Sequence, residues 1–148
     1  MLLICAALGG GLSGRAAAAP ENSAGACVLV HADTGQTLYA KNADKHMLIA
    51  STTKIMTALV VIDRCDPNAQ VTVKPEWTGI EGSSMYLKAG ETYSVKDLLY
   101  GLLLVSGNDA ATALAGFCGG SIEGFAKLMN QRAAELGLQN SHFQNPHG

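Results

Sequence analysis

The feature that most constrains this chain is a block at positions 50–59, ASTTKIMTAL, which opens a long apolar segment. Ser51 and Lys54 lie three residues apart in this block, and residues at that spacing share one face of a helix. The apolar residues after Lys54 continue to Ile62, so the helix has little polar surface to present to solvent. The block therefore predicts a helix from Ser51 to about Arg64, with a hydroxyl and a buried amine together at its start.

Ser51 and Lys54 are also candidates for nucleophilic catalysis. A serine hydroxyl becomes a good nucleophile when a base removes its proton, and a lysine can be that base only when burial or nearby positive charge lowers its pKa. A fall in that pKa from about 10.4 to about 7–8 disfavours the charged amine by about 4 kcal/mol. The positive end of the helix would favour an oxyanion at Ser51. The same spacing also fits a serine cap and a surface lysine, so the rest of the chain must decide.

Length and composition describe one globular domain with an export leader. The 148 residues carry a formal charge of −2, 48% are hydrophobic and 15% are charged, which leaves no basic surface for nucleic acid. Residues 1–20 are typical of a leader, because a short apolar run at 2–8 precedes small residues at 16–20. No basic residue precedes that run, so either the leader begins further upstream or the segment is an alanine- and glycine-rich tail. Residues 21–148 form the predicted domain.

Three cysteines remain after the leader, namely Cys27, Cys65 and Cys118. No C-x-x-C pair occurs, so we interpret them as small buried apolar side chains, with one disulfide and one free thiol as the alternative. The four histidines, His147 among them, have no partner at a metal-ligand spacing and are interpreted as ordinary strand and loop residues. The sequence thus predicts no metal ion and no cofactor.

Strand candidates are few. Residues 27–31 and 37–41 are predicted to form a β-hairpin, because Asp33 and Gly35 between them suit a turn. Only one further short strand is predicted, at 71–73. A two-stranded hairpin is marginally stable alone, so this sheet is expected to be missing strands.

Three more helices are predicted after residue 90. A capping box at 94–97 opens a helix at 98–105 that is apolar enough to be buried nearly all round. A short alanine-rich helix follows at 110–117. Ser121 caps a last helix that runs to Leu136 and carries one apolar stripe.

The sequence SGND at 106–109 lies between two of these helices. It is open to two interpretations. Asn108 could cap the following helix in a helix–helix turn, or the polar side chains could point together into a cleft.

Four sequence elements in this order resemble a known family. They are the turn at 33–35, the block at 50–59, the sequence SGNDAA at 106–111 and the sequence NPHG at 145–148. Together they are similar to the serine-type D-alanyl-D-alanine carboxypeptidases, the low-molecular-mass penicillin-binding proteins. The resemblance covers roughly residues 24–148.

The resemblance implies a role for each matching residue. Ser51 would be the acylated nucleophile and Lys54 the base that activates it. Ser106 would relay a proton to the leaving D-alanine, and Asn108 would hold the substrate amide or the Lys54 side chain. The implied substrate is a peptidoglycan stem peptide ending in D-Ala-D-Ala, and β-lactam antibiotics would acylate the same serine. No cofactor is implied.

The resemblance also implies the fold and the location. The fold is α+β, of the β-lactamase/transpeptidase type, with a helical cluster packed on an antiparallel sheet and a cleft between Ser51 and Ser106. The family acts in cell-wall synthesis and cell shape, so the protein would be secreted to the outer face of the cytoplasmic membrane, the periplasm or the cell wall.

The chain departs from the family in one respect, since it contains no Lys-Thr-Gly, the third family motif. With the missing strands, this absence predicts that 21–148 is the N-terminal part of a longer catalytic domain. This part alone is expected to be inactive, and membrane contact would come only from a C-terminal region.

Two other functions remain open. A class A β-lactamase shares the S-x-x-K spacing, but that family has aspartate where this chain has Gly107, and no acidic residue follows Glu135 to act as its deacylating base. The other is a non-catalytic cell-wall module that binds stem peptides or β-lactams, which the absence of Lys-Thr-Gly favours.

Overall fold

The computed structural model describes residues 21–148, so the predicted leader at 1–20 lies outside the described residues. The chain divides into two compact units at His46 and Met47. Within the described residues, no helix has the length and apolar character needed to cross a membrane.

The first unit is a β-hairpin. Strand β1 (Cys27–Val30) pairs antiparallel with β2 (Thr37–Lys41), and the ladder shifts its register at the end near the turn. Gly35 closes the turn with a φ of 69°, a conformation that glycine adopts without steric cost. The predicted hairpin is confirmed. No third strand joins it among the described residues, and its apolar side chains Val28 and Leu38 remain exposed.

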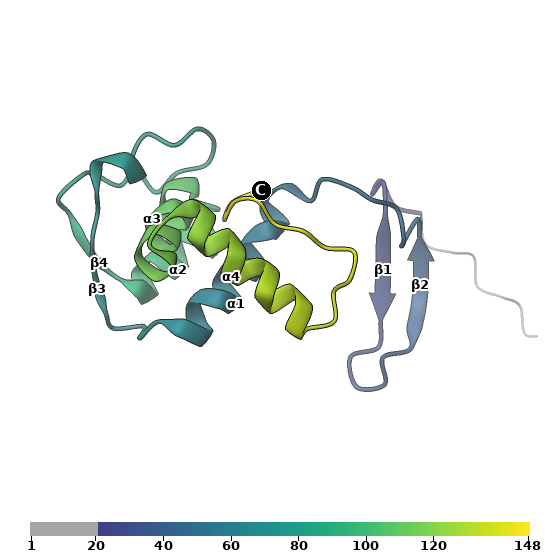
Figure 1. The fold of residues 1–148 in the computed structure, drawn as a ribbon. Helices are drawn as coiled ribbons and strands as arrows, with labels where there is room; N and C mark the ends of the chain where they lie inside the picture. The colour runs from purple at the N-terminus through teal and green to yellow at the C-terminus, as the bar shows by residue number, and fades with distance from the viewer. Residues whose placement is uncertain (1–20) are drawn as a thin grey trace, which may run out of the picture. The chain divides into compact units, whose positions relative to one another are not determined.

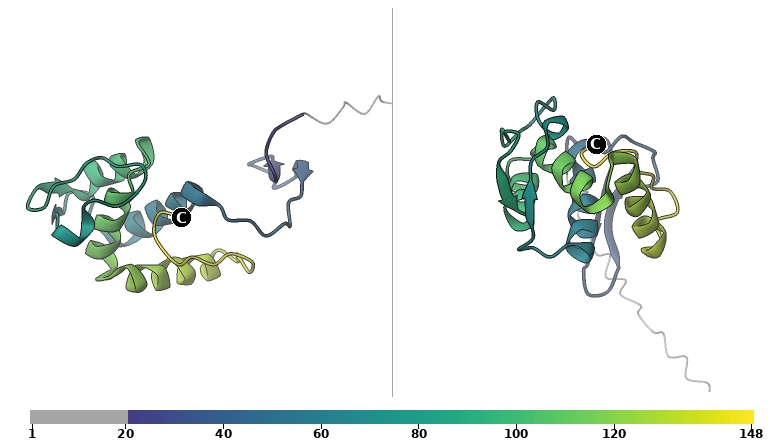
Figure 2. Two further views of the ribbon diagram at one scale, coloured as in Figure 1. Left: turned by 90° about the horizontal axis from the view of Figure 1, so that it is seen from above. Right: turned by 60° about the vertical axis from the view of Figure 1, so that its left-hand side comes forward.

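The second unit is a cluster of four helices with a short β-ladder (Figure 1). The ladder lies at the edge of the cluster beside α2, as the further views show (Figure 2). The elements are α1 (Thr53–Arg64), β3 (Gln70–Thr72), β4 (Thr92–Ser94), α2 (Val95–Leu104), α3 (Asn108–Gly119) and α4 (Ile122–Glu135).

Side-chain caps explain where two of the helices begin. At α2, the Ser94 hydroxyl accepts a hydrogen bond from the Asp97 backbone N–H, and the Asp97 carboxylate accepts one from the Ser94 N–H, so the predicted capping box is confirmed. At α4, the Ser121 hydroxyl accepts a hydrogen bond from the Gly124 N–H at 2.9 Å. Both caps satisfy backbone donors that the first helical turn leaves free.

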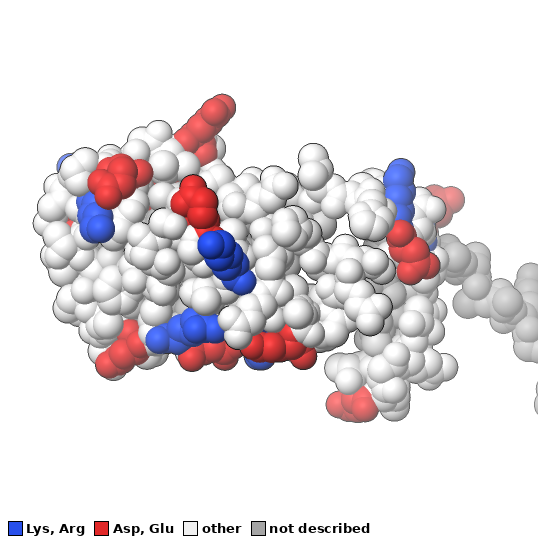
Figure 3. All heavy atoms as spheres, in the orientation of Figure 1, with Lys and Arg blue, Asp and Glu red and all other residues white. Residues whose placement is uncertain are grey.

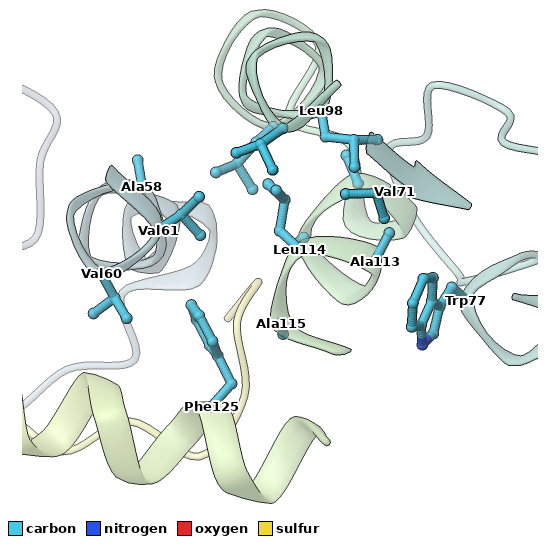
Figure 4. Close-up of a cluster of buried hydrophobic side chains, with 14 of the residues drawn as sticks. Ala58, Val60, Val61, Val71, Trp77, Leu98, Ala113, Leu114, Ala115 and Phe125 are labelled. Carbon is cyan, nitrogen blue, oxygen red and sulfur yellow. The ribbon is translucent and has the colours of Figure 1, made fainter. Parts of the chain in front are cut away.

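The core lies between the helices (Figure 4). Phe125 points from α4 into the space between α1 and α3, and Leu114 on α3 lies at the centre of the cluster. Val60 and Val61 of α1 are fully buried against them, as is Leu98 of α2. Burial of side chains of this size stabilises a fold by about 1.5–3 kcal/mol each.

Two sequence predictions about this unit are wrong. The helix α2 is buried on one face only, because Leu104 is 79% exposed and Leu103 and Tyr100 are more than half exposed. Strand β4 was not predicted, because its three residues show no apolar alternation of their own and become a strand by pairing with β3.

Charged side chains of both signs are interspersed over the face of the molecule that Figure 3 shows. Within the described residues, no group of three or more histidine, cysteine, aspartate or glutamate side chains could hold a metal ion.

A disulfide joins Cys65, directly after α1, to Cys118, near the end of α3, and Cys27 keeps a free thiol. The interpretation of Cys65 and Cys118 as unpaired apolar side chains is therefore wrong, and the alternative of one disulfide and one free thiol holds. Their spacing gave no sign of the pairing, because the two ends meet only when the helices pack.

We expect Cys65→Ser to destabilise the domain by about 4 kcal/mol, since the disulfide closes a loop with a sequence separation of 53 residues and so restricts the unfolded chain. Urea unfolding of the full gene product measures this change. Cys27→Ser, which removes a free thiol, should change the free energy of unfolding by less than about 0.5 kcal/mol. Equal stability of Cys65→Ser and the parent would contradict the prediction.

Candidate active site

The site is built around the buried amine of Lys54, which lies in the first turn of α1 and is 2% exposed. Its Nζ lies within hydrogen-bond distance of three side-chain oxygens from two parts of the chain. They are Ser51 Oγ at 3.2 Å, Ser106 Oγ at 3.0 Å and Asn108 Oδ1 at 2.6 Å. The structure thus brings together all four residues that the sequence singled out.

Ser51 lies in a single 3₁₀ turn, Ala50–Thr52, that leads into α1, and its side chain is exposed. The helix begins slightly later than predicted, at Thr53, but Ser51 still lies at the positive end of α1. Ala50 has a φ of 45°, in the left-handed region that non-glycine residues rarely adopt. The chain therefore turns sharply just before the Ser51 hydroxyl.

Ser106 lies in the link between α2 and α3, also with a left-handed φ, of 56°. The next residue, Gly107, donates its N–H to the carbonyl of Gly101 in α2 at 3.0 Å, which fixes the link against the helix that precedes it. Strained residues of this kind tend to occur at functional sites, where the surrounding structure holds them.

Asn108 is the first residue of α3 and not its cap, so the helix-cap interpretation is wrong. Its amide is held from both ends, because Oδ1 accepts from Lys54 while Nδ2 donates to the Glu81 carbonyl at 2.6 Å. Its backbone N–H donates to the Ser83 carbonyl at 2.7 Å. Gly82, between these two partners, has no room for a side chain, since a Cβ there would meet Asn108 Nδ2.

The electrostatics of the site shift the Lys54 amine toward its neutral form. Burial lowers the pKa of Lys54 below its ordinary value, because the charged form loses its hydration. Its three hydrogen-bond partners are neutral oxygens, so none of them restores the charged form as a carboxylate would. This is the environment that a lysine needs to act as a base.

Sequence reasoning missed His147, which lies near the site. Thr57 of α1 donates its hydroxyl to the Pro146 carbonyl at 2.6 Å, and a side chain at Gly148 would overlap the Ala50 carbonyl, so this segment lies along the start of α1. Burial lowers the pKa of His147, and the charge of Lys54 lowers it further, while the Gly148 backbone opposes both effects. The only indication in the sequence was the motif NPHG.

We expect the stability of the parent protein to rise with pH, relative to Lys54→Met, between the pKa of Lys54 in the folded state and 10.5. In that window the unfolded protein binds more protons than the folded one, because the folded pKa is lowered, so the free energy of unfolding rises with pH. The limiting slope is about 1.4 kcal/mol per pH unit for one proton. Urea unfolding at several pH values measures the difference.

The control for this experiment is Lys127→Met, which removes an exposed lysine of α4. Its stability should stay parallel to that of the parent across the same pH range. A constant difference between the parent and Lys54→Met at all pH values would show that the Lys54 pKa is not lowered.

Comparison with known proteins identifies the family. Residues 13–148 match the D-alanyl-D-alanine carboxypeptidase family (Peptidase_S11), and the chain belongs to this family. It is 41% identical over 132 residues to the D-alanyl-D-alanine carboxypeptidase DacF of Bacillus subtilis. The matched region covers 86% of this chain and 34% of that protein. It is 45% identical over 141 residues to DacC of Escherichia coli, covering 88% of this chain and 35% of that protein.

Solved structures show the same fold. Penicillin binding protein 6B from Escherichia coli superposes with a TM-score of 0.82 at 40% identity, over 88% of this chain and 44% of that one. A D-alanyl-D-alanine carboxypeptidase from Mycobacterium tuberculosis gives a TM-score of 0.83 at 36% identity, over 87% of this chain and 48% of that one. The predicted α+β penicillin-binding fold is confirmed. The chain spans about a third of the length of the curated relatives.

Proposed function

We propose that this chain is part of a serine D-alanyl-D-alanine carboxypeptidase that removes the terminal D-alanine from peptidoglycan stem pentapeptides. The observation that carries this proposal is the Lys54 amine, buried and within hydrogen-bond distance of Ser51, Ser106 and Asn108. Family membership supports the reaction type.

The hydrogen-bonding capacity of a neutral lysine matches its surroundings. A neutral amine has two N–H donors and one lone pair. The two donors serve Ser106 Oγ and Asn108 Oδ1, which leaves the lone pair to accept the proton of the Ser51 hydroxyl. Lys54 can then act as general base without any rearrangement of its side chain.

The proposed reaction is acyl transfer through Ser51. Its oxygen attacks the carbonyl carbon of the penultimate D-alanine, and its proton passes to Lys54. The peptide C–N bond then breaks, Lys54 returns a proton through Ser106 to the departing amine, and D-alanine leaves. Water adds to the acyl-enzyme ester and releases the shortened peptide. The Ser51 backbone N–H, at the start of α1, would stabilise the oxyanion.

The other assignments follow from this activity. Residues 21–148 are proposed as the N-terminal part of the catalytic domain, and residues 1–20 as an export leader. The protein would act outside the cytoplasm, on the wall, and β-lactams would acylate it. A non-catalytic module that binds stem peptides is the second candidate, because no Lys-Thr-Gly occurs in these 148 residues.

A β-lactam should form a covalent adduct on Ser51 in the full gene product, because the strained amide traps the nucleophile as an ester. Mass spectrometry of the digested protein locates the adduct. Ser51→Ala should abolish labelling. Lys54→Arg should lose most of it, since arginine does not give up its proton at physiological pH. Ser106→Ala should slow labelling by about 10²–10⁴-fold, the usual contribution of a proton relay.

The matched control is Ser141→Ala, which removes an exposed loop hydroxyl and should label like the parent. An adduct that persists in Ser51→Ala, or one on Ser106, would show that the nucleophile is wrongly assigned. Labelling without release of D-alanine from a stem pentapeptide would favour the binding module.

Asn108→Asp should shift the acylation rate to higher pH. It replaces a neutral oxygen 2.6 Å from Lys54 Nζ by a carboxylate, which stabilises the charged amine and raises the pKa of Lys54. Acylation needs the neutral amine, so at neutral pH the rate should fall by up to about tenfold for each unit by which the pKa rises.

The pH profile of β-lactam acylation measures this shift, and Asn68→Asp, at an exposed turn, is the control that should leave the profile in place. An unshifted pH profile in Asn108→Asp would show that Lys54 is not the base.

A further inference from the structure

The buried carboxylate of Asp109 takes no part in the steps above. Asp109 is the second residue of α3 and is 1% exposed. Its two oxygens accept four hydrogen bonds, with Oδ1 bonded to the backbone N–H groups of Met85 at 3.0 Å and Ala110 at 2.9 Å. Oδ2 is bonded to the Ser84 hydroxyl at 2.6 Å and the Leu87 N–H at 3.0 Å. Every lone-pair position of the carboxylate therefore has a donor.

Three of the four donors come from residues 84–87, which form neither helix nor strand. Burial by itself would raise the pKa of Asp109, but the hydrogen bonds from Ser84, Leu87 and Met85 outweigh it and lower that pKa. The carboxylate therefore stays charged, and its hydrogen bonds are of the stronger, charge-assisted kind. Asp109 is the anchor that fastens this segment to the start of α3.

The neighbouring residue, Asn108, binds the same stretch of chain. Its backbone N–H donates to the Ser83 carbonyl and its Nδ2 donates to the Glu81 carbonyl. Only the NH₂ end of an amide can donate to a carbonyl, so the position of the Glu81 carbonyl decides which end of Asn108 faces Lys54. A flipped amide would turn two donors toward the amine and remove one of its acceptors.

We propose that Asp109 is a positioning residue for the active site. By fixing residues 84–87 it holds the Glu81 carbonyl against Asn108, and so keeps Asn108 Oδ1 turned toward Lys54. Its effect on the reaction rate rests on the function proposed above, whereas its effect on the Asn108 amide rests on the geometry alone. The two effects can be measured separately.

The first measurement is the side-chain amide signal of Asn108 in the full gene product, by NMR with ¹⁵N-labelled asparagine. Both ends of this amide are hydrogen-bonded in the parent, so its two protons should be well dispersed and should exchange slowly with water. Asp109→Asn puts an NH₂ group among N–H donors and loosens the segment. The signal should then move to the position of a free amide, and Asn108→Ala identifies the signal by its loss.

The second measurement is the rate of Ser51 acylation by a β-lactam. Asp109→Asn should slow the acylation step by about 10–100-fold, as expected when a reacting group is misplaced by about an ångström, with a smaller change in the concentration needed for half-saturation. Asp97→Asn is the matched control, since it also removes a hydrogen-bonded carboxylate from the first turn of a helix, at the α2 capping box. It should lower stability while keeping both the amide signal and the acylation rate.

Coupling to Asn108 separates positioning from a general loss of structure. Adding Asp109→Asn to Asn108→Ala should slow acylation by less than about twofold relative to Asn108→Ala alone. The reason is that the Asn108 amide, through which Asp109 acts, is already absent. The effect of Asp109→Asn on the free energy of unfolding should persist in the Asn108→Ala background. Ser84→Ala removes one of the four donors and should slow acylation several-fold. It is the variant to use if Asp109→Asn does not fold.

The proposal is overturned if the Asn108 signal is unchanged in Asp109→Asn and in Ser84→Ala. It is also overturned if acylation slows equally with Asn108 present and absent, or if Asp97→Asn slows it as much. A parent protein that is not acylated, but whose Asn108 signal moves in Asp109→Asn, would refute the proposed function and support the positioning role.

Discussion

The burial of one amine, that of Lys54, is the constraint on which the rest of this structure depends. A 2%-exposed lysine loses its hydration, so the fold must bring polar atoms to it from elsewhere in the chain. The link between α2 and α3 supplies two of them, on Ser106 and Asn108. This requirement fixes where α3 begins relative to α1, and the same burial lowers the pKa of the amine. The same geometry thus gives the buried amine its polar partners and, in the proposed reaction, would prepare Lys54 to act as a base.

Holding this arrangement requires a rigid frame, because Ala50 and Ser106 both have left-handed backbone conformations that cost about 1–2 kcal/mol each. The frame is the packing of α1 with α3. Their first turns meet at Lys54, and their far ends are joined by the Cys65–Cys118 disulfide. Because α1 and α3 are held together at both ends, neither helix can slide along the other. Ala50 and Ser106 therefore cannot relax to an unstrained conformation by a small shift of the helices.

The sequence indicated much of this, and the exceptions have physical reasons. The caps at Ser94 and Ser121 and the block at 50–59 are local patterns, so they predict the helices that they open and the pair Ser51 and Lys54. The site roles of Ser106 and Asn108 came only from the resemblance to a family. The pairing of Cys65 with Cys118 and the formation of β4 depend on contacts between distant segments, which spacing does not encode. The exposed face of α2 was predicted to be buried because apolar side chains there look the same in a sequence whether or not another element covers them.

The proposed reaction needs a path for one proton, and the described residues would supply it. Lys54 Nζ lies within hydrogen-bond distance of both Ser51 Oγ and Ser106 Oγ, so in the proposed reaction these residues would form a continuous path for one proton. Every hydrogen bond along this path lies within residues 47–148, although apolar residues such as Ile55 and Ile62 of α1 remain exposed there. The polar groups of the site thus have their hydrogen-bond partners within these residues, whereas part of the apolar surface of α1 is left uncovered.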